Sequence, residues 1–185
     1  MTRPSATLPL PRAESTSPGL QLLESTARID VHSGLTLYRV KATESRWDGL
    51  IPAGMIGGWL TTLENLGDDA WVDEFSEVVG EDARVLGSAL VCEYSRVSGD
   101  AMLSGDSSVR RSVAMGTVHL SGNATARDCV LSGSVQLQDD ATVMRSTLGG
   151  KVIVRGGAEL TDCDLDGAEI FEGNVRFAGD SSTLD

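Results

Sequence analysis

Aromatic side chains are scarce in this sequence: they make up 4% of its 185 residues, whereas glycine occurs 21 times. A helical bundle with a bulky core needs more large side chains, so this balance favours short strands joined by tight turns. No run of about 18 apolar residues suggests a membrane span, and the opening residues MTRPSATLPLP lack the apolar stretch of a signal peptide. We therefore expect a chain made in the cytoplasm, with no membrane partner.

Basic residues are also few, with 15 Lys and Arg against 27 Asp and Glu and a formal net charge of -12. Binding to nucleic acid depends on a basic surface that neutralises phosphates, so we expect no nucleic-acid partner. Proline is nearly confined to the start of the sequence, where four of the five occur between Pro4 and Pro18. Such a segment cannot bury a core, and residues 1–33 are expected to form an extended or disordered arm, which a partner protein could order.

One phrase occurs five times with a constant period, beginning at Tyr94, Arg111, Asp128, Arg145 and Asp162. Apolar or small residues fill the same six positions of each phrase, in pairs two residues apart, which is the period of a strand. The tenth position shows the pattern well: Leu103, Leu120, Leu137, Val154 and Phe171. Three pairs in each phrase predict three short strands in each turn of the chain.

Corners are expected between these strands. The sixth position of every phrase is glycine, in Gly99, Gly116, Gly133, Gly150 and Gly167, and glycine tolerates the positive φ of a sharp corner. Upstream, valines recur every six residues, which indicates 18-residue coils with a change to 17 near Val109. The predicted fold class is all-β: a triangular single-stranded parallel β-solenoid (β-helix) with 17–18-residue coils and an N-terminal cap. The hexapeptide pattern favours a left-handed coil.

All three tryptophans fall between residues 34 and 72, where bulky rings can seal a repetitive core. We interpret 34–72 as an N-terminal cap and 73–185 as the β-solenoid. Within the first phrase position, Arg111, Asp128, Arg145 and Asp162 alternate in charge, which predicts exposed ion pairs between neighbouring coils. Cys129 and Cys163 share a position two coils apart, about 9–10 Å by strand spacing, too far for a disulfide, and three unpaired thiols indicate a reducing compartment.

The segments LYRVKA, AGMIGGWL and ENLGDDAWV, followed by VGEDARVLGSALV, resemble the YdcK-like β-solenoid (hexapeptide-repeat-like) proteins of bacteria and their phages. The resemblance covers residues 37–110. It matches Gly57, Gly58 and Trp59 to the cap motif, and it places Trp71 in the motif that follows; Trp47 also falls in the cap. The 17-residue coils and the proline-rich arm depart from the family pattern. The resemblance implies a solenoid fold and a phage association, and it supplies no catalytic residues.

Hexapeptide solenoids include acyltransferases that use a histidine as general base, and His119 is the one residue here that could take this role. It lies between two inward positions, so its side chain is expected to point outward. No long loop interrupts the coils to build a substrate pocket, and an acidic surface does not suit the phosphates of CoA. We therefore predict no catalytic residue, with His119 as the weak alternative. The nine-residue calcium repeat is absent, and we expect no metal and no cofactor.

Outward positions on two faces are partly apolar, and an apolar stripe on a protein surface often marks an interface. The residues predicted to form it are Met102, His119, Gln136, Ile153, Ile170, Val113 and Val130. Packing around a threefold axis predicts a homotrimer. The expected function is that of a structural protein, a phage head-decoration or minor capsid component that docks on a capsid or tail through residues 1–33, so that the virion is a further expected location. The alternatives are an acyltransferase that uses His119 and a soluble interaction or inhibitor module.

Overall fold

The computed structural model describes residues 16–178 with short gaps, namely 68, 106–107, 111–112, 115–118, 121–124, 129, 135, 139, 141, 146, 152, 158, 163, 166–169 and 173–175. In parts of the strands, including His119 and Val113, the backbone alone is described. The described elements are short strands and two single-turn 3-10 helices. No helix among the described residues is long and apolar enough to cross a membrane.

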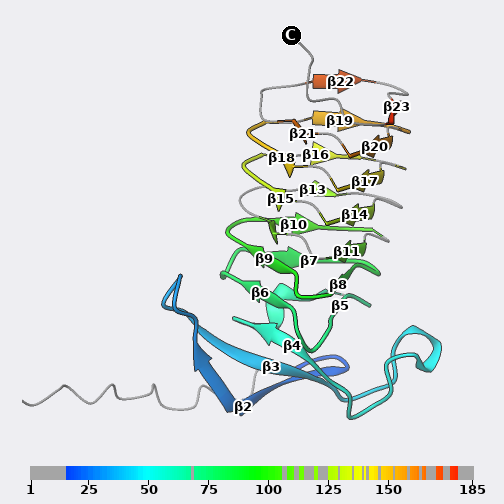
Figure 1. Ribbon diagram of the computed structural model, residues 1–185. Helices are drawn as coiled ribbons and strands as arrows, with labels where there is room; N and C mark the ends of the chain where they lie inside the picture. The colour runs from blue at the N-terminus through cyan, green and yellow to red at the C-terminus, as the bar shows by residue number, and fades with distance from the viewer. Residues whose placement is uncertain are drawn as a thin grey trace, which may run out of the picture.

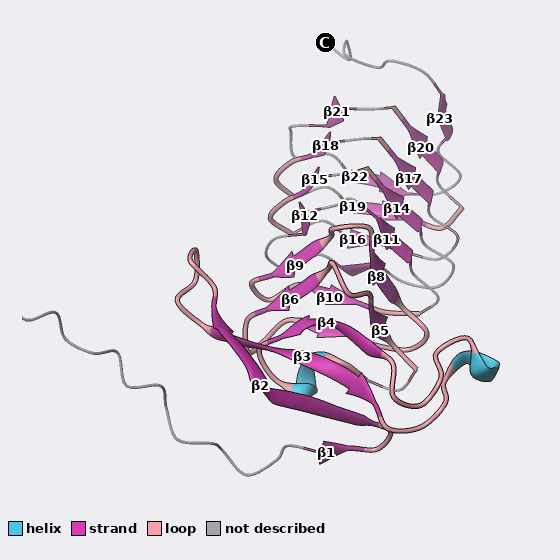
Figure 2. Cartoon of the chain, turned by 60° about the horizontal axis from the view of Figure 1, so that its bottom comes forward, coloured by secondary structure: helices cyan, strands magenta, loops and turns pink. Residues whose placement is uncertain are grey.

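The described part of the chain starts with four strands that turn back on one another, which we call the N-terminal meander (Figure 1; Figure 2). They are β1 (Thr16–Ser17), β2 (Leu20–Ile29), β3 (Thr36–Ala42) and β4 (Ile56–Leu60), and each pairs antiparallel with the next. The turn between β2 and β3 is closed by Asp30, whose carboxylate accepts hydrogen bonds from the backbone and the hydroxyl of Ser33. Gly34 completes that turn at a φ of 74°.

Two 3-10 helices connect the meander to the later strands. The first, η1 (Trp47–Gly49), lies in the loop between β3 and β4. The second, η2 (Leu63–Asn65), comes after β4 and carries a capping box, in which the Thr62 hydroxyl and the Asn65 side chain bond reciprocally to backbone N–H groups. The Asn65 amide also donates to the carbonyls of Gly80 and Ala83, so this buried turn anchors the meander to the next segment.

From Trp71 onward, successive strands enter three sheets in rotation, and we call residues 71–178 the parallel stack (Figure 1). The seven-stranded sheet contains β5 (Trp71–Val72), β8 (Leu90–Cys92), β11 (Ser108–Arg110), β14 (Thr125–Arg127), β17 (Thr142–Met144), β20 (Glu159–Thr161) and β23 (Arg176–Ala178). The six-stranded sheet contains β7 (Arg84–Val85), β10 (Met102–Leu103), β13 (His119–Leu120), β16 (Gln136–Leu137), β19 (Ile153–Arg155) and β22 (Ile170–Glu172). The meander continues into β6 (Glu77–Val79), β9 (Arg96–Ser98), β12 (Val113–Ala114), β15 (Val130–Leu131), β18 (Thr147–Leu148) and β21 (Asp164–Leu165), which makes a ten-stranded sheet.

Equivalent positions of the repeated phrase pair with one another in this stack. Leu103 pairs with Leu120, and Leu137 with Val154, each with the residue one phrase later in the sequence. The inward positions whose side chains are described are buried, including Val97, Ala101, Leu103, Val143 and Leu148. The column register predicted from the period of the phrase is therefore confirmed at these positions.

The predicted fold class, however, is wrong. A triangular, left-handed, single-stranded parallel β-solenoid is built from parallel ladders, whereas the sheet that begins with β1 is mixed. Its strands β1 to β4 pair antiparallel, and β4 then pairs antiparallel with β3 on one side and parallel with β6 on the other. Short reversals of the chain produce antiparallel neighbours, because a parallel pair needs a longer crossover. The chain is an all-β protein of short strands in which an antiparallel meander shares a sheet with parallel ladders.

Coil length shortens along the stack. Glu77 pairs with Arg96, 19 positions later in the chain. Arg84 then pairs with Met102, one position fewer along the chain, and Arg96 pairs with Val113, one fewer again. The uniform 18-residue length expected upstream is thus wrong for the first coil. Cys92 pairs with Arg110 and Val97 pairs with Ala114. Five positions separate the first residues of these two pairs and four separate the second, so the change from 18 to 17 occurs between the seven-stranded and the ten-stranded sheet.

The glycines of the sixth phrase position behave differently from the prediction. Gly99 has the expected positive φ of 76°, but Gly133 and Gly150 do not. At these corners the left-handed residue is the next one, Ser134 at 66° and Lys151 at 50°. Gly116 and Gly167 lie outside the described residues. Glycine at this position therefore lies at the corner, but the residue with the positive φ is not always the glycine itself.

Candidate functional site

Five of the predicted interface residues lie in one column of the six-stranded sheet. Consecutive strands pair Met102 with His119, His119 with Gln136, Gln136 with Ile153, and Ile153 with Ile170. We call these five residues the outward column. Met102 is 36% exposed and Ile170 is 57% exposed, while Gln136 and Ile153 are half-buried. The structure thus brings the predicted residues together, and their role as an interface stays a prediction.

The two remaining interface residues lie on the neighbouring sheet. Val113 of β12 pairs with Val130 of β15, and Val130 is 45% exposed. Val130 pairs in turn with the exposed Thr147, so this second column becomes polar after two coils. The outward column holds described apolar side chains at Met102, Ile153 and Ile170, with Gln136 lying between Met102 and Ile153.

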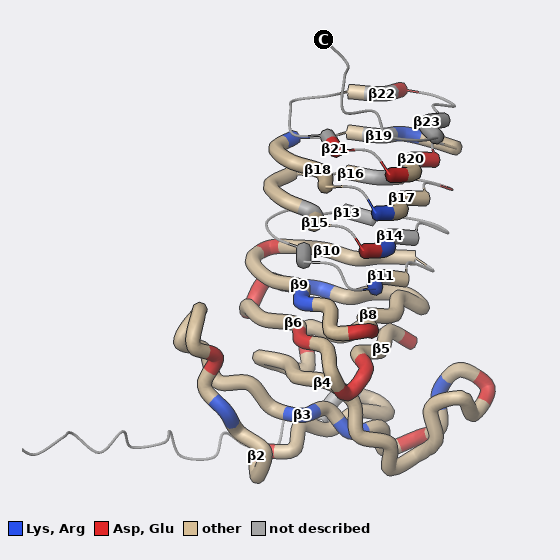
Figure 3. Tube along the Cα trace, viewed as in Figure 1, with Lys and Arg blue, Asp and Glu red and all other residues tan. Residues whose placement is uncertain are grey.

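Paired charges run along a third edge of the stack. Figure 3 shows acidic and basic segments one above another beside β11, β14, β17 and β20. Arg145 Nε lies 3.5 Å from Asp128 Oδ2, which confirms one of the predicted ion pairs between coils. Both groups are accessible to solvent, and the Arg145 side chain is 68% exposed, so this pair contributes little to stability.

Two glycines of the predicted cap are needed for close backbone contacts. A Cβ atom on Gly57 would lie 2.5 Å from the Val72 carbonyl oxygen, and one on Gly58 would lie 2.3 Å from the Ser76 carbonyl oxygen. Such distances are well inside van der Waals contact. The two glycines therefore let β4 approach the first strands of the parallel stack.

The three tryptophans of the predicted cap have separate surroundings. Trp71 is buried in the hydrophobic core together with Val72 and Leu66. Trp47 lies in η1 and donates its indole N–H to the Asp69 carbonyl at 2.5 Å. Trp59 is half-buried on β4. Of the three, Trp71 is the one buried in the core.

Trp59 is flanked by cations. The guanidinium carbon of Arg28 lies 4.0 Å from the Trp59 ring centroid, and that of Arg39 lies 5.3 Å from it. Such contacts contribute about 0.5–1 kcal/mol each at exposed sites. Arg28 also forms an ion pair with Glu77 of β6. The contacts of Trp59 and Arg28 therefore hold β2 against β4 and β6.

Arg96 connects the meander to the stack through buried charge. Its guanidinium contacts both oxygens of Asp30, at 3.1 and 2.8 Å, and Glu77 Oε2 at 2.5 Å. The Asp30 side chain is 7% exposed. Hydrogen bonds from Arg96, and then from Ser33, hold the pKa of Asp30 well below its usual range, and the same pair raises the pKa of Arg96. Sequence analysis missed this cluster, because its members lie far apart along the chain.

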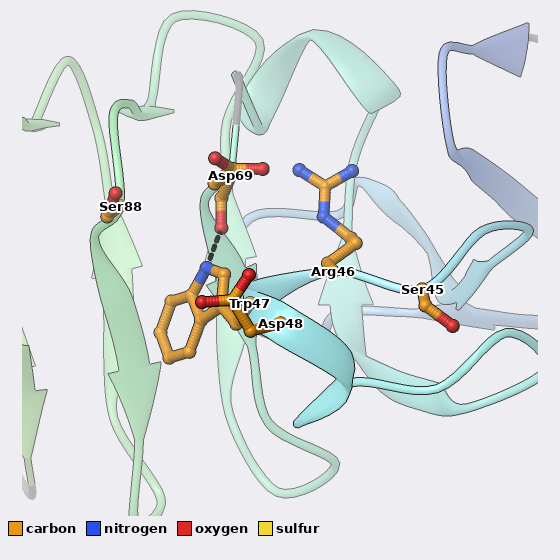
Figure 4. A pocket seen from close by; sticks show the side chains of 6 residues that line it. All are labelled: Ser45, Arg46, Trp47, Asp48, Asp69 and Ser88. Carbon is orange, nitrogen blue, oxygen red and sulfur yellow. Dashed lines mark hydrogen bonds between the residues drawn. The ribbon is translucent and has the colours of Figure 1, made fainter.

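A pocket of about 510 Å³ opens beside η1, and we call it the Arg46 pocket (Figure 4). The residues that line it are Ser45, Arg46, Trp47, Asp48, Asp69 and Ser88. Arg46 is 8% exposed, and its Nε and Nη2 atoms are buried without a hydrogen-bond partner among the described residues. Sequence analysis missed this site too, since a single arginine in an irregular loop carries no periodic signal.

The groups considered for catalysis and metal binding show no assembled site in the described part of the chain. His119 lies in β13 as expected, and the structure describes its backbone alone. Cys92 is buried, and burial raises the pKa of its thiol; Cys129 and Cys163 lie outside the described residues. Over the same described residues, no three His, Cys, Asp or Glu side chains are grouped so that they could hold a metal ion.

Comparison with known proteins assigns the chain to no family. No protein-family model matches the sequence, and no curated protein sequence is significantly similar to it. The resemblance to the YdcK-like proteins therefore stays a prediction that depends on the motifs given above.

Proposed function

We propose that the chain is a non-enzymatic structural protein that forms a homotrimer through the outward column and acts within a larger protein assembly, such as a phage particle. The observation that carries the proposal is the register of the outward column, in which Ile153 and Ile170 are neighbours and Met102 lies in the same column. Exposed apolar side chains on adjacent strands are costly in water, and contact with another apolar surface removes that cost.

A second copy of the same chain is a suitable partner for the outward column. Parallel strands place the side chains of one column about 4.8 Å apart along a straight line. A second copy of the same chain carries a column with the same spacing, so its side chains can interdigitate with those of the first. Closed cyclic packing also leaves no such column free to associate further, which is why most homo-oligomers are closed.

The role in a phage particle is supported by the motifs of residues 37–110 and by the proline-rich segment at the start of the chain. A docking arm formed by residues 1–33 would have to act mainly through the part that precedes β1, because β1 is itself paired with β2. The residues of β2 pair with β3, and Leu20 is buried, so this part of the segment is already used within the chain.

The oligomeric state of the full chain tests the first part of the proposal. Sedimentation equilibrium is expected to give three times the 19.5 kDa chain mass, and Ile153→Asp is expected to give the monomer mass. Ser108→Asp is the matched control, because Ser108 lies on the seven-stranded sheet, and it should leave the trimer unchanged. A monomeric wild type, or a trimer that survives Ile153→Asp, would overturn the trimer.

The particle role needs its own test. Phage particles purified from the source strain are expected to contain the chain when they are probed with an antibody against it. Absence of the chain from such particles contradicts this role and leaves the trimer unaffected. Release of free CoA from acyl-CoA by the wild type, lost in His119→Ala, would instead establish the acyltransferase alternative.

A further inference from the structure

The Arg46 pocket contains a charged group that lacks a counter-ion in the described structure. The guanidinium group of arginine is a donor that carries a positive charge and has no acceptor of its own, so its burial calls for an anionic or hydrogen-bond acceptor partner. Leaving a buried charged donor without a partner costs several kcal/mol in a typical protein, because the group gives up its hydration. Two of its nitrogen atoms, Nε and Nη2, are in this state. Arg46 therefore does not form a structural ion pair within the described chain, because the carboxylate partner is missing.

Carboxylates line the same pocket without neutralising Arg46. In Figure 4 the Asp69 carboxylate faces the guanidinium side of the pocket, and Asp48 lies beside the Trp47 ring. Neither carboxylate forms an ion pair with Arg46 within the described chain, where such pairs extend to 4.0 Å. A simple anion would be attracted by the guanidinium of Arg46 but repelled by the two carboxylates. A ligand that carries both a negative and a positive group could pair with Arg46 and with the carboxylates at the same time.

The loop that forms the pocket is held in an uncommon conformation. Trp47 and Asp48 have φ values of 50° and 51°, in the left-handed region that bulky L-residues rarely adopt. Backbone hydrogen bonds between Arg46 and Ile51 close the loop, and the bond from the Trp47 indole to Asp69 fixes the ring beside the pocket. The lining groups are thus held in place before any ligand binds, which lowers the entropic cost of binding.

We propose that the Arg46 pocket binds a small zwitterion of the amino-acid type. Its carboxylate would pair with the guanidinium of Arg46, since the planar fork of arginine suits a carboxylate. Its ammonium group would lie toward Asp69 and Asp48, and its side chain along the Trp47 ring. The volume of about 510 Å³ accommodates a ligand of this size.

The test is calorimetric titration of the full chain with L-alanine, L-glutamate and L-lysine, each against three probes that lack one feature. These probes are acetate, L-alaninamide and inorganic phosphate. At least one amino acid is expected to bind at least 10-fold more tightly than all three probes. The same amino acid should shift the Trp47 indole N–H signal in a ¹H–¹⁵N spectrum, and this signal is assigned by its loss in Trp47→Phe. Equal or tighter binding of acetate or phosphate contradicts the zwitterion, and no binding of any amino acid at about 10 mM contradicts the site.

Two variants locate the binding. Arg46→Gln keeps most of the side-chain volume and is expected to weaken amino-acid binding at least 10-fold; unchanged affinity would exclude Arg46. Asp69→Asn is expected to weaken amino-acid binding while leaving the weak affinity for acetate unchanged; an equal loss for both overturns the assignment of the ammonium group. If Arg46→Gln does not fold, the probe series on the wild type still decides the proposal.

Discussion

The guanidinium of Arg96 contacts the carboxylate of Asp30 at two points: Nη1 lies 3.1 Å from Oδ1, and Nη2 lies 2.8 Å from Oδ2. The two residues are 66 positions apart, one in the turn after β2 and the other in β9. Their contact joins the antiparallel meander to the parallel stack. Because the Asp30 side chain is almost fully buried, water competes less for this pair than for the exposed pair of Arg145 and Asp128.

Stability should depend on the charge of Asp30. Its pKa is lowered in the folded state, so its contribution is complete above the unfolded pKa of about 4 and is lost as the pH falls toward the folded value. Asp30→Asn keeps one side-chain oxygen but loses the charge, and it is expected to lower the free energy of unfolding by about 2 kcal/mol at pH 7, as for a hydrogen bond to a charged group. The difference from wild type should shrink below about pH 4 in denaturant titrations. Asp82→Asn, at an exposed position, is the control; a gap for Asp30→Asn that stays constant from pH 7 to pH 2.5 contradicts the prediction.

Gly58 should tolerate no side chain. A Cβ there would lie 2.3 Å from the Ser76 carbonyl oxygen and 2.4 Å from that of Asp73, and backbone atoms cannot move aside as a flexible side chain can. We expect Gly58→Ala to lower the free energy of unfolding by about 3 kcal/mol. Gly133→Ala is the matched control, because nothing lies within 4 Å of its added Cβ, and it should change stability by less than about 0.5 kcal/mol. Equal denaturation midpoints for the two variants would show that β4 does not need this close approach.

The repeated strands could be predicted from sequence, because inward residues recur both within a strand and between coils. Val97, Leu103 and Leu148 are buried for this reason. The strand β2 could not be predicted in the same way. Its sequence LQLLESTARI lacks regular alternation, and it is stabilised by pairing with β3, across a register shift between Leu23 and Arg28. The fold class was wrong because neither β2 nor the antiparallel pairing of β3 with β4 was predicted.

The same distinction applies to the candidate sites: a site formed by the repeat could be predicted from sequence, and a site formed by long-range contacts could not. The outward column follows from the repeat, so Met102, Ile153 and Ile170 could be placed together from the sequence. The contact of Arg96 with Asp30 and the burial of Arg46 depend on how the meander folds onto the stack. Neither has a local pattern, since each side chain is placed by residues distant in the chain.

The left-handed corners give a prediction at single-residue resolution. Ser134 has a φ of 66°, which costs an L-residue about 1–2 kcal/mol and glycine almost nothing. Glycine loses part of that advantage through the greater entropy of the unfolded chain. Ser134→Gly is therefore expected to raise the free energy of unfolding by about 0.5–1 kcal/mol. Ser132→Gly is the control, because Ser132 has an ordinary φ, and it should lower the free energy of unfolding by a similar amount. Thermal or chemical denaturation measures both variants. A loss of stability in both would contradict the assignment of Ser134 as the left-handed corner residue.

Cys92 should report on opening of the stack at β8. Its thiol is buried, and burial raises its pKa, so the fraction of reactive thiolate at pH 8 is lower than for a free cysteine. We expect iodoacetamide to alkylate the Cys92 peptide at least 10-fold more slowly in the folded chain than in about 6 M guanidinium chloride, as measured by mass spectrometry. The denatured sample is the control for the intrinsic reactivity of this peptide. Asp30→Asn should accelerate alkylation of the folded chain if reaction requires global unfolding, because reaction then follows the population of the open state. Alkylation at the same rate in the folded and denatured chains would show that the thiol is accessible, and that β8 does not bury it.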